Sequence, residues 1–190
     1  MQYKMKVDLL LTCKSLNQLR YHAVVGFLFE NETFSSGYLQ QLNDRLENHL
    51  TYLRENQLLT GKQQEVFLVA PQEKINTEKI LFFGLGSVNA YSQDMIDIAI
   101  KKALLTLEKL YVYDLLILIS SENTMKAVYI DLIKSLMAGL INYCNEKEKG
   151  EFNIVFLIEE QYKNDLKNLE KELRSYFNPT FDYSILIEVD

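Results

Sequence analysis

The sequence alternates short apolar runs with amphipathic helical patterns, and this alternation restricts the possible folds more than any other feature. From Ile80 onward the order is strand, helix, strand, helix, strand, helix, strand. Such an order is typical of parallel strands joined by right-handed crossovers, with helices on both faces of the sheet. The sequence therefore predicts an α/β fold with a largely parallel sheet.

Seven segments have the length and apolar character of strands, and several are continuous apolar runs typical of strands buried on both faces. These segments are Val7–Thr12, Ala23–Phe29, Val66–Val69, Ile80–Phe83, Leu115–Ile119, Ile154–Ile158 and Ser184–Val189. Two of them precede the first helical pattern, and we expect this N-terminal part to add antiparallel pairs. The predicted architecture is a three-layer α/β/α sandwich around a mixed, mostly parallel sheet of six or seven strands. Residues 1–190 are expected to form a single domain.

Four stretches repeat apolar residues at three- and four-residue steps, as amphipathic helices do. The stretches are Leu39–Leu53, Ile96–Leu110, Met125–Tyr143 and Tyr162–Phe177. Ser92 is the predicted N-cap of the second helix, and Asp94 stands favourably in its first turn. Gly139 lies inside the third stretch, where a glycine costs about 1 kcal/mol relative to alanine. We therefore expect another element of the protein to approach the backbone closely at Gly139.

Charge and composition exclude several classes of function. The net charge is −6 and no run of Lys and Arg is present, which argues against binding to nucleic acid. No apolar run approaches the ~18 residues of a membrane span, and the first residues do not resemble a signal peptide. We therefore expect a cytoplasmic protein without membrane contact. Cys13 and Cys144 are far apart in the sequence, and we expect both to be reduced.

Several stretches, taken in order, resemble the N-terminal domain of the leucyl aminopeptidase family. The strand Lys-Ile-Leu-Phe-Phe-Gly-Leu-Gly is similar to one in that domain that ends in a Gly-Leu-Gly turn. The helix after it has the expected length and texture, and a later helix matches the family's third-helix pattern. The stretches that carry the resemblance are Lys79–Gly86, Asp94–Leu110, Ser135–Tyr143, Asn145–Gly150, Phe27–Glu30 and Leu58–Lys62. Together they extend over residues 7–175, and the resemblance implies a macro-domain-like α/β/α fold.

The catalytic part of that family is not matched in this sequence. In the family a second, C-terminal domain supplies a Lys, several Asp and Glu ligands for two metal ions, and an Asn-Thr-Asp-Ala-Glu-Gly-Arg signature. Asn76-Thr-Glu-Lys79 shares only the start of that signature and leads into a predicted strand. His22 and His49 have no second histidine or cysteine at metal-ligand spacing. We therefore expect no aminopeptidase activity, no catalytic residues, no metal and no cofactor.

Two functions remain open from the sequence. The first is a stand-alone, non-catalytic domain that acts in protein–protein assembly or regulation, with a protein partner or as a homo-oligomer. The second is binding of an ADP-ribose-type nucleotide, because macro-domain relatives bind ADP-ribose at the C-terminal ends of their strands.

Gly84, Gly86, Ser87 and Asn89 are the candidate residues for such a nucleotide. Glycines between a strand and a helix allow a phosphate to approach the backbone, and the helix N-terminus favours an anion. Asn89 stands where a dinucleotide fingerprint has its third glycine. A tight structural turn is therefore the favoured reading of this loop.

Overall fold

The structure is a computed structural model that describes residues 5–16, 20–90, 92–119, 126–146, 150–175 and 182–188. Met125, Phe177 and Val189, which we predicted as ends of elements, lie outside these ranges. The strands are β1 (Met5–Thr12), β2 (Tyr21–Phe29), β3 (Val66–Val69), β4 (Thr77–Gly86), β5 (Asp114–Ile119), β6 (Gly150–Leu157) and β7 (Asp182–Glu188). The α-helices are α1 (Gly37–Arg45), α2 (His49–Glu55), α3 (Gln93–Lys109), α4 (Lys126–Asn145) and α5 (Leu166–Arg174). Two short 3₁₀ turns, η2 (Val88–Ala90) and η3 (Glu160–Asp165), precede α3 and α5.

All seven strands form one sheet, in the order β3-β4-β2-β5-β6-β1-β7. Within it β3 and β4 pair antiparallel, and the other neighbours pair parallel. The predicted mixed, mostly parallel sheet is confirmed. The expectation that the first two strands add antiparallel pairs is wrong. The chain crosses from the end of β1 to the start of β2, and β6 and β5 lie between the two strands in the sheet.

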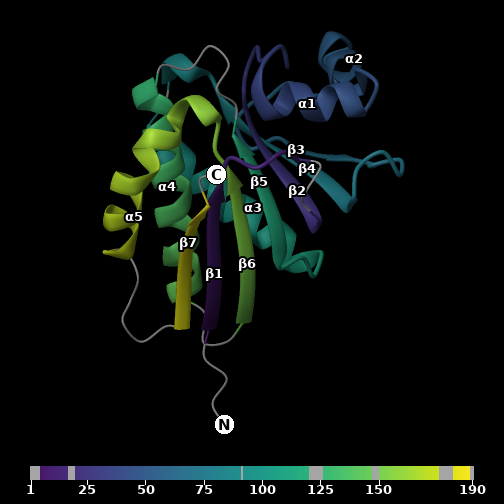
Figure 1. The fold of residues 1–190 in the computed structure, drawn as a ribbon. Coiled ribbons are helices and arrows are strands. Elements are labelled where there is room, and N and C mark those ends of the chain that lie inside the picture. Colours follow the sequence, from purple (N-terminus) through teal and green to yellow (C-terminus); the bar gives the residue numbers. More distant parts are fainter. Residues whose placement is uncertain are drawn as a thin grey trace.

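Helices pack on both faces of the sheet, which gives the predicted three layers (Figure 1). The buried side chains divide into two clusters accordingly. One cluster joins α3, α4 and α5 to one face, and the other joins α1 and α2 to the opposite face. Residues of one strand alternate between the clusters: Val24 and Leu28 of β2 belong to the second, whereas Val25 and Phe27 belong to the first. This alternation is the two-residue period of a strand covered on both sides.

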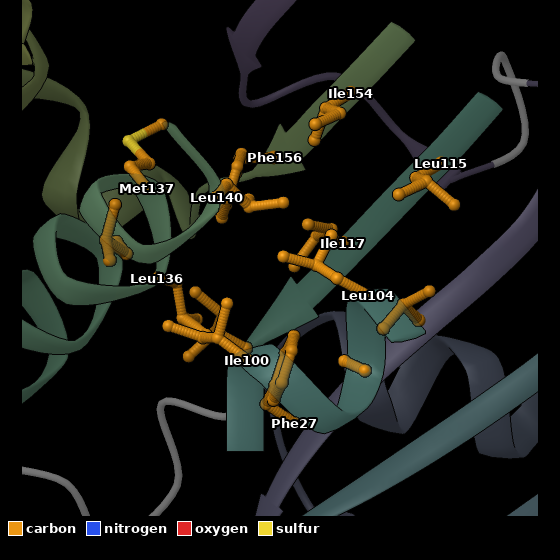
Figure 2. Packing of buried hydrophobic residues seen from close by; sticks show 14 of the residues in the cluster. Phe27, Ile100, Leu104, Leu115, Ile117, Leu136, Met137, Leu140, Ile154 and Phe156 are labelled. Carbon is orange, nitrogen blue, oxygen red and sulfur yellow. The ribbon is translucent and has the colours of Figure 1, made fainter. Parts of the chain in front are cut away.

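The larger cluster is tightly filled between α3, α4 and the sheet. Figure 2 shows Ile100 of α3 and Leu136 of α4 close to Phe27 and Ile117 of the strands. A Cβ atom at Gly139 would lie 2.6 Å from Ile100 Cδ1, so the predicted close approach at this glycine is confirmed, and the approaching element is α3. The gap that remains among these side chains is about 10 Å³, which leaves no room for a small-molecule ligand.

The first predicted helix is divided into two in the structure. The leucines of the stripe are buried as expected, but Glu47 and Asn48 adopt left-handed backbone angles, with φ of 55° and 62°. The buried side chain of Asn43 stabilises this break. Its Nδ2 donates to Thr51 Oγ1 at 2.8 Å, and its Oδ1 accepts from the Thr51 amide at 3.1 Å. Asn43 of α1 thus bonds Thr51 of α2 across the break, and these bonds stabilise the turn between the two helices.

The other expectations about the helices and cysteines have clear outcomes. The Ser92 side chain caps α3 by accepting from the Met95 amide at 3.4 Å, as predicted. Cys13 and Cys144 are both free thiols. Burial raises the pKa of Cys144 to about 12, so this thiol is unreactive at neutral pH. Among the described residues, no helix combines the length and apolar character that crossing a membrane requires.

Candidate functional site

The four residues predicted for a nucleotide loop lie at the C-terminal end of β4. Gly84 and Gly86 lie, with Leu85 between them, at the buried end of this strand. Ser87 follows the strand and is half-buried, and Asn89 is exposed within η2. The strand therefore extends three residues further than predicted, and the glycines belong to the sheet rather than to the turn before α3.

The backbone of Gly84 and Gly86 is bonded within the protein. The Gly84 amide donates to the Glu65 carbonyl at 3.0 Å, and the Gly86 amide donates to the Gly61 carbonyl at 2.8 Å. A Cβ atom at Gly84 would overlap the carbonyl oxygen of Lys62. Both glycines thus allow β4 to lie against the segment 61–65. A phosphate near this loop would depend on the side chains of Ser87 and Asn89 rather than on the glycine amides.

The N-terminus of α1 is occupied by a carboxylate of the same chain. The Tyr38 amide donates to Glu159 Oε1 at 2.9 Å, and Glu159 follows β6 in the sequence. Gly37 has a φ of 67°, and a Cβ atom there would overlap the Glu159 carboxylate. The side chain of the N-cap residue Ser36 makes no capping hydrogen bond to α1. Because a helix N-terminus favours negative charge, Glu159 takes the position that a bound anion would otherwise prefer.

Two buried tyrosines hold this end of the sheet together. The Tyr129 hydroxyl accepts from the Glu159 amide at 3.2 Å, and its ring stacks on Tyr162 with centroids 4.4 Å apart. The Tyr38 hydroxyl donates to the Lys14 carbonyl at 3.1 Å. Burial raises the pKa of both Tyr38 and Tyr129, so both hydroxyls stay protonated at neutral pH. The hydroxyls and the carboxylate are therefore fixed by internal contacts.

The two histidines lie apart from each other and from any cluster of ligands. His22 is exposed at the start of β2, and His49 begins α2, where its ring stacks on Tyr52 at 6.1 Å. Within the described ranges, no group of three or more His, Cys, Asp or Glu residues has the arrangement of a metal site.

A cleft of about 740 Å³ lies at the opposite end of the strands from the Gly84–Asn89 loop, beside the N-terminal ends of β2, β4 and β5. Tyr21 and His22 of β2, Thr77 of β4 and Asp114 of β5 line it. The turn between β3 and β4 and the last turn of α1 form its other walls. The residues contributed by those parts are Glu73, Lys74, Ile75, Asn76 and Arg45, and Arg20 and Glu78 complete the lining.

The inner wall of this cleft combines a tyrosine and a carboxylate with shifted acidities. Burial, with Asp114 nearby, raises the pKa of Tyr21 to about 12. Burial likewise raises the pKa of Asp114, whereas His22 and a hydrogen bond from Asn153 lower it. Asn153 Nδ2 donates to Asp114 Oδ1 at 2.8 Å. Asp114 is thus held in place by neighbours on β2 and β6.

No contiguous stretch of the sequence points to this cleft, because its residues are scattered from position 20 to position 114. They come together only when parallel strands align their N-terminal ends. The contact between Glu159 and Tyr38 was missed for the same reason, since 121 positions separate the two residues. The Gly84–Asn89 loop could be found because its residues are contiguous.

Comparison with known proteins places the fold and the family. The structure superposes on a mutant of tomato leucine aminopeptidase with a TM-score of 0.62 and 17% identity, over 90% of this chain and 37% of that enzyme. It also resembles a mutant macrodomain of Oceanobacillus iheyensis with ADPR, with a TM-score of 0.59 and 14% identity over 87% and 94% of the two chains. The macrodomain of Mycobacterium tuberculosis DarG gives a TM-score of 0.53 at 14% identity, over 77% and 96%.

These likenesses confirm the macro-domain-like α/β fold. The chain spans little more than a third of the tomato enzyme's length, so the superposition covers only part of that protein. Residues 24–164 match the model of the N-terminal domain of the cytosol aminopeptidase family. This match extends over most of the chain and includes the strands and helices that carried the resemblance. The chain therefore belongs to the cytosol aminopeptidase family, through its N-terminal domain.

Proposed function

We propose that this chain is a non-catalytic domain that acts through protein–protein assembly, by pairing of β7 with β7 of a second copy. The observation that carries the proposal is the outer edge of the sheet. In the described sheet β7 pairs with β1 alone, so its other side offers a row of backbone amides and carbonyls. Such an edge is a template for a further strand unless the sequence protects it.

The centre of β7 lacks the usual protections of an edge strand, since its acidic residues stand only at the two ends. The strand is seven residues long, and its centre reads Ser-Ile-Leu-Ile without lysine or proline. Leu186, in this centre, is 60% exposed. The opposite edge strand, β3, has only four residues. Since short strands and edge lysines are the common ways to prevent pairing, β7 is the edge that favours association.

The charges beside β7 allow a second copy of the chain to approach this edge. Glu188 pairs with Lys14 at 2.6 Å, and Asp8 pairs with Lys6 at 2.8 Å. Ser184 also donates to Asp8 at 2.6 Å. These contacts neutralise Asp8 and Glu188, which reduces the repulsion between two approaching copies. A β7–β7 contact uses the same surface of both copies and closes as a two-fold dimer.

The absence of catalysis is part of the same proposal. Hydrolysis with two metal ions needs several carboxylates that converge on one place. In the parts of the chain that the structure describes, Glu159 caps α1, Glu65 bonds the segment 60–61, and Asp114 is held by Asn153. These carboxylates serve separate structural contacts at different places. We therefore expect no turnover of a leucyl chromogenic substrate with Mn²⁺ or Zn²⁺.

Sedimentation velocity tests the proposed assembly. We expect the wild-type chain to shift from monomer to dimer between about 1 µM and about 200 µM, and Leu186→Lys to weaken dimerisation by at least about tenfold. Lysine at this position leaves the fold intact because Leu186 is exposed.

Leu68→Lys is the matched control for this experiment, since Leu68 is 59% exposed on the other edge strand, β3. It should dimerise like the wild type. A wild-type chain that stays monomeric over the whole range, or equal weakening by both substitutions, would contradict pairing through β7.

A nucleotide of the ADP-ribose type is the second candidate function, to be bound near Gly84, Gly86, Ser87 and Asn89. The support for it is the macro-domain-like fold, because one protein of similar structure, a mutant macrodomain of Oceanobacillus iheyensis, is described with ADPR. The engaged amides of both glycines and the Glu159 carboxylate at α1 argue against it. Calorimetry with ADP-ribose separates the candidates: saturable heat that Asn89→Ala removes would favour the nucleotide over assembly alone.

A further inference from the structure

We propose that the cleft beside the N-terminal ends of β2, β4 and β5 binds a small organic anion that carries a carboxylate or phosphate group, held by Arg20 and Arg45. The volume of about 740 Å³ falls within the ~300–1,000 Å³ of ligand pockets. Gly84 and Asn89 lie at the C-terminal end of β4, at the other end of the strands. The cleft is therefore a different site from the proposed nucleotide loop.

The charges that line the cleft leave two guanidinium groups uncommitted. Lys74 pairs with Glu47 at 2.8 Å, and Glu78 pairs with Lys79 at 3.3 Å. Asp114 accepts a hydrogen bond from Asn153 and makes no ion pair in the part of the chain that the structure describes. Among the described residues, Arg20 and Arg45 line the same cleft and take part in no ion pair. Guanidinium groups bind carboxylates and phosphates through two parallel hydrogen bonds, which gives both affinity and orientation.

The rest of the lining defines what the remainder of the ligand would contact. Tyr21 and Ile75 offer apolar surface, and Asn76 offers an amide. Glu73 also lines the cleft without an ion pair in the described parts of the chain, and it would accept from a hydroxyl or ammonium group. Among the residues that the structure describes, two unpaired guanidinium groups face two unpaired carboxylates, Glu73 and Asp114, so an anion would be held by the paired hydrogen bonds of the guanidinium groups rather than by a net positive charge of the lining. A ligand of this class fits the cleft better than a polyanion, since the whole chain has a charge of −6.

The part of β2 and β5 that faces the cleft is rigid, which favours binding. Thr77 Oγ1 donates to the His22 carbonyl at 3.2 Å and so joins β4 to β2. Asn153 fixes Asp114 at 2.8 Å. The cleft wall is therefore formed before a ligand arrives, so binding costs little conformational entropy of the protein.

Two-dimensional amide NMR with citrate and with pyrophosphate tests the site at a fixed ionic strength of about 0.15 M, where surface attraction is screened. We expect at least one of the two probes to bind with a dissociation constant below about 1 mM. The shifted amides should include Tyr21, His22, Thr77 and Asp114. Citrate alone would identify a carboxylate ligand, and pyrophosphate alone a phosphate.

The double variant Arg20→Gln, Arg45→Gln should weaken binding by at least about tenfold, because each guanidinium donates charge-assisted hydrogen bonds. Lys101→Gln, Lys109→Gln is the matched control, since it removes the same charge from exposed positions of α3. It should change affinity by less than about twofold. Circular dichroism tests whether both variants fold. If the Arg20→Gln, Arg45→Gln variant does not fold, the single variant Arg45→Gln takes its place. Failure of both probes to bind the wild type, shifts mapped elsewhere, or equal loss in the control would overturn the proposal.

Discussion

Gly84→Ala is expected to lower the free energy of unfolding by about 3 kcal/mol or more, because overlap with fixed backbone cannot be relieved by a rotamer change. The added methyl group would overlap the Lys62 carbonyl oxygen and lie 2.8 Å from the Gly61 carbonyl carbon. That backbone is held by the Glu65 side chain, which accepts from the Gly61 amide at 2.5 Å and the Thr60 amide at 2.9 Å. Urea denaturation, followed by circular dichroism, measures the loss.

Gly139→Ala is the control for this substitution. The new methyl group there would meet Ile100 Cδ1 at 2.6 Å and Cγ2 at 3.0 Å; these are side-chain atoms, which can shift in part, whereas the atoms that crowd Gly84 are backbone. Alanine also gains about 1 kcal/mol of helix propensity inside α4, so the net change should stay below about 1.5 kcal/mol. Equal stability of Gly84→Ala and the wild type would show that segment 61–65 does not constrain β4 as described.

Tyr129→Ala is expected to cost about 4 kcal/mol, the usual range for removing a large buried aromatic side chain. Tyr129 has no exposed surface, and its ring stacks on Tyr162 at 4.4 Å. Tyr129→Phe should cost only about 1 kcal/mol, because it removes one hydrogen bond, to the Glu159 amide, and keeps the packing. The two variants together separate packing from hydrogen bonding in the same denaturation assay.

A surface tyrosine provides the comparison for Tyr129. Tyr52 is 57% exposed and its ring stacks on His49, so Tyr52→Ala should change stability by less than about 0.5 kcal/mol. If Tyr129→Ala were as mild as Tyr52→Ala, the stacked tyrosines would not be what joins α4 to the end of β6.

Much of the fold could be predicted because it is encoded by local periodicity. Strands of alternating or continuous apolar residues and helical stripes are visible in any short window, and the N-cap Ser92 is a local signal. The break after α1 was not predictable from the leucine stripe, which continues across it. The break depends on the contacts of Asn43 with Thr51, and these form only once the chain has turned.

The arrangement of the strands was harder to predict than their existence. The sequence order places β1 and β2 next to each other, but β6 and β5 lie between them in the sheet. A prediction of pairing from neighbouring segments therefore gave antiparallel strands where the structure has parallel ones. The same rearrangement moves β7 to the outer side of β1. Only the assembled sheet identifies it as an edge, and thus as the surface proposed for assembly.

The candidate sites differ in the same way. Gly84 and Gly86 form a contiguous motif, so their special role was visible, although the structure shows that they pack against the segment 61–65. The cleft beside the N-terminal ends of β2, β4 and β5 brings together Arg20 before β2, Arg45 of α1 and Asp114 of β5. No window of sequence contains such a group. Three-dimensional alignment of the strand ends was needed to find it.

Hydrogen exchange of the β7 amides at two protein concentrations is the most direct test of assembly through this edge. Alternate amides of β7 point away from β1, and in a monomer we expect them to exchange rapidly because no described strand pairs with them. Between about 5 µM and about 500 µM, dimerisation should slow their exchange by at least about tenfold, while the outward amides of β3 stay unchanged. Exchange of the outward β7 amides that is rapid at both concentrations would contradict the account.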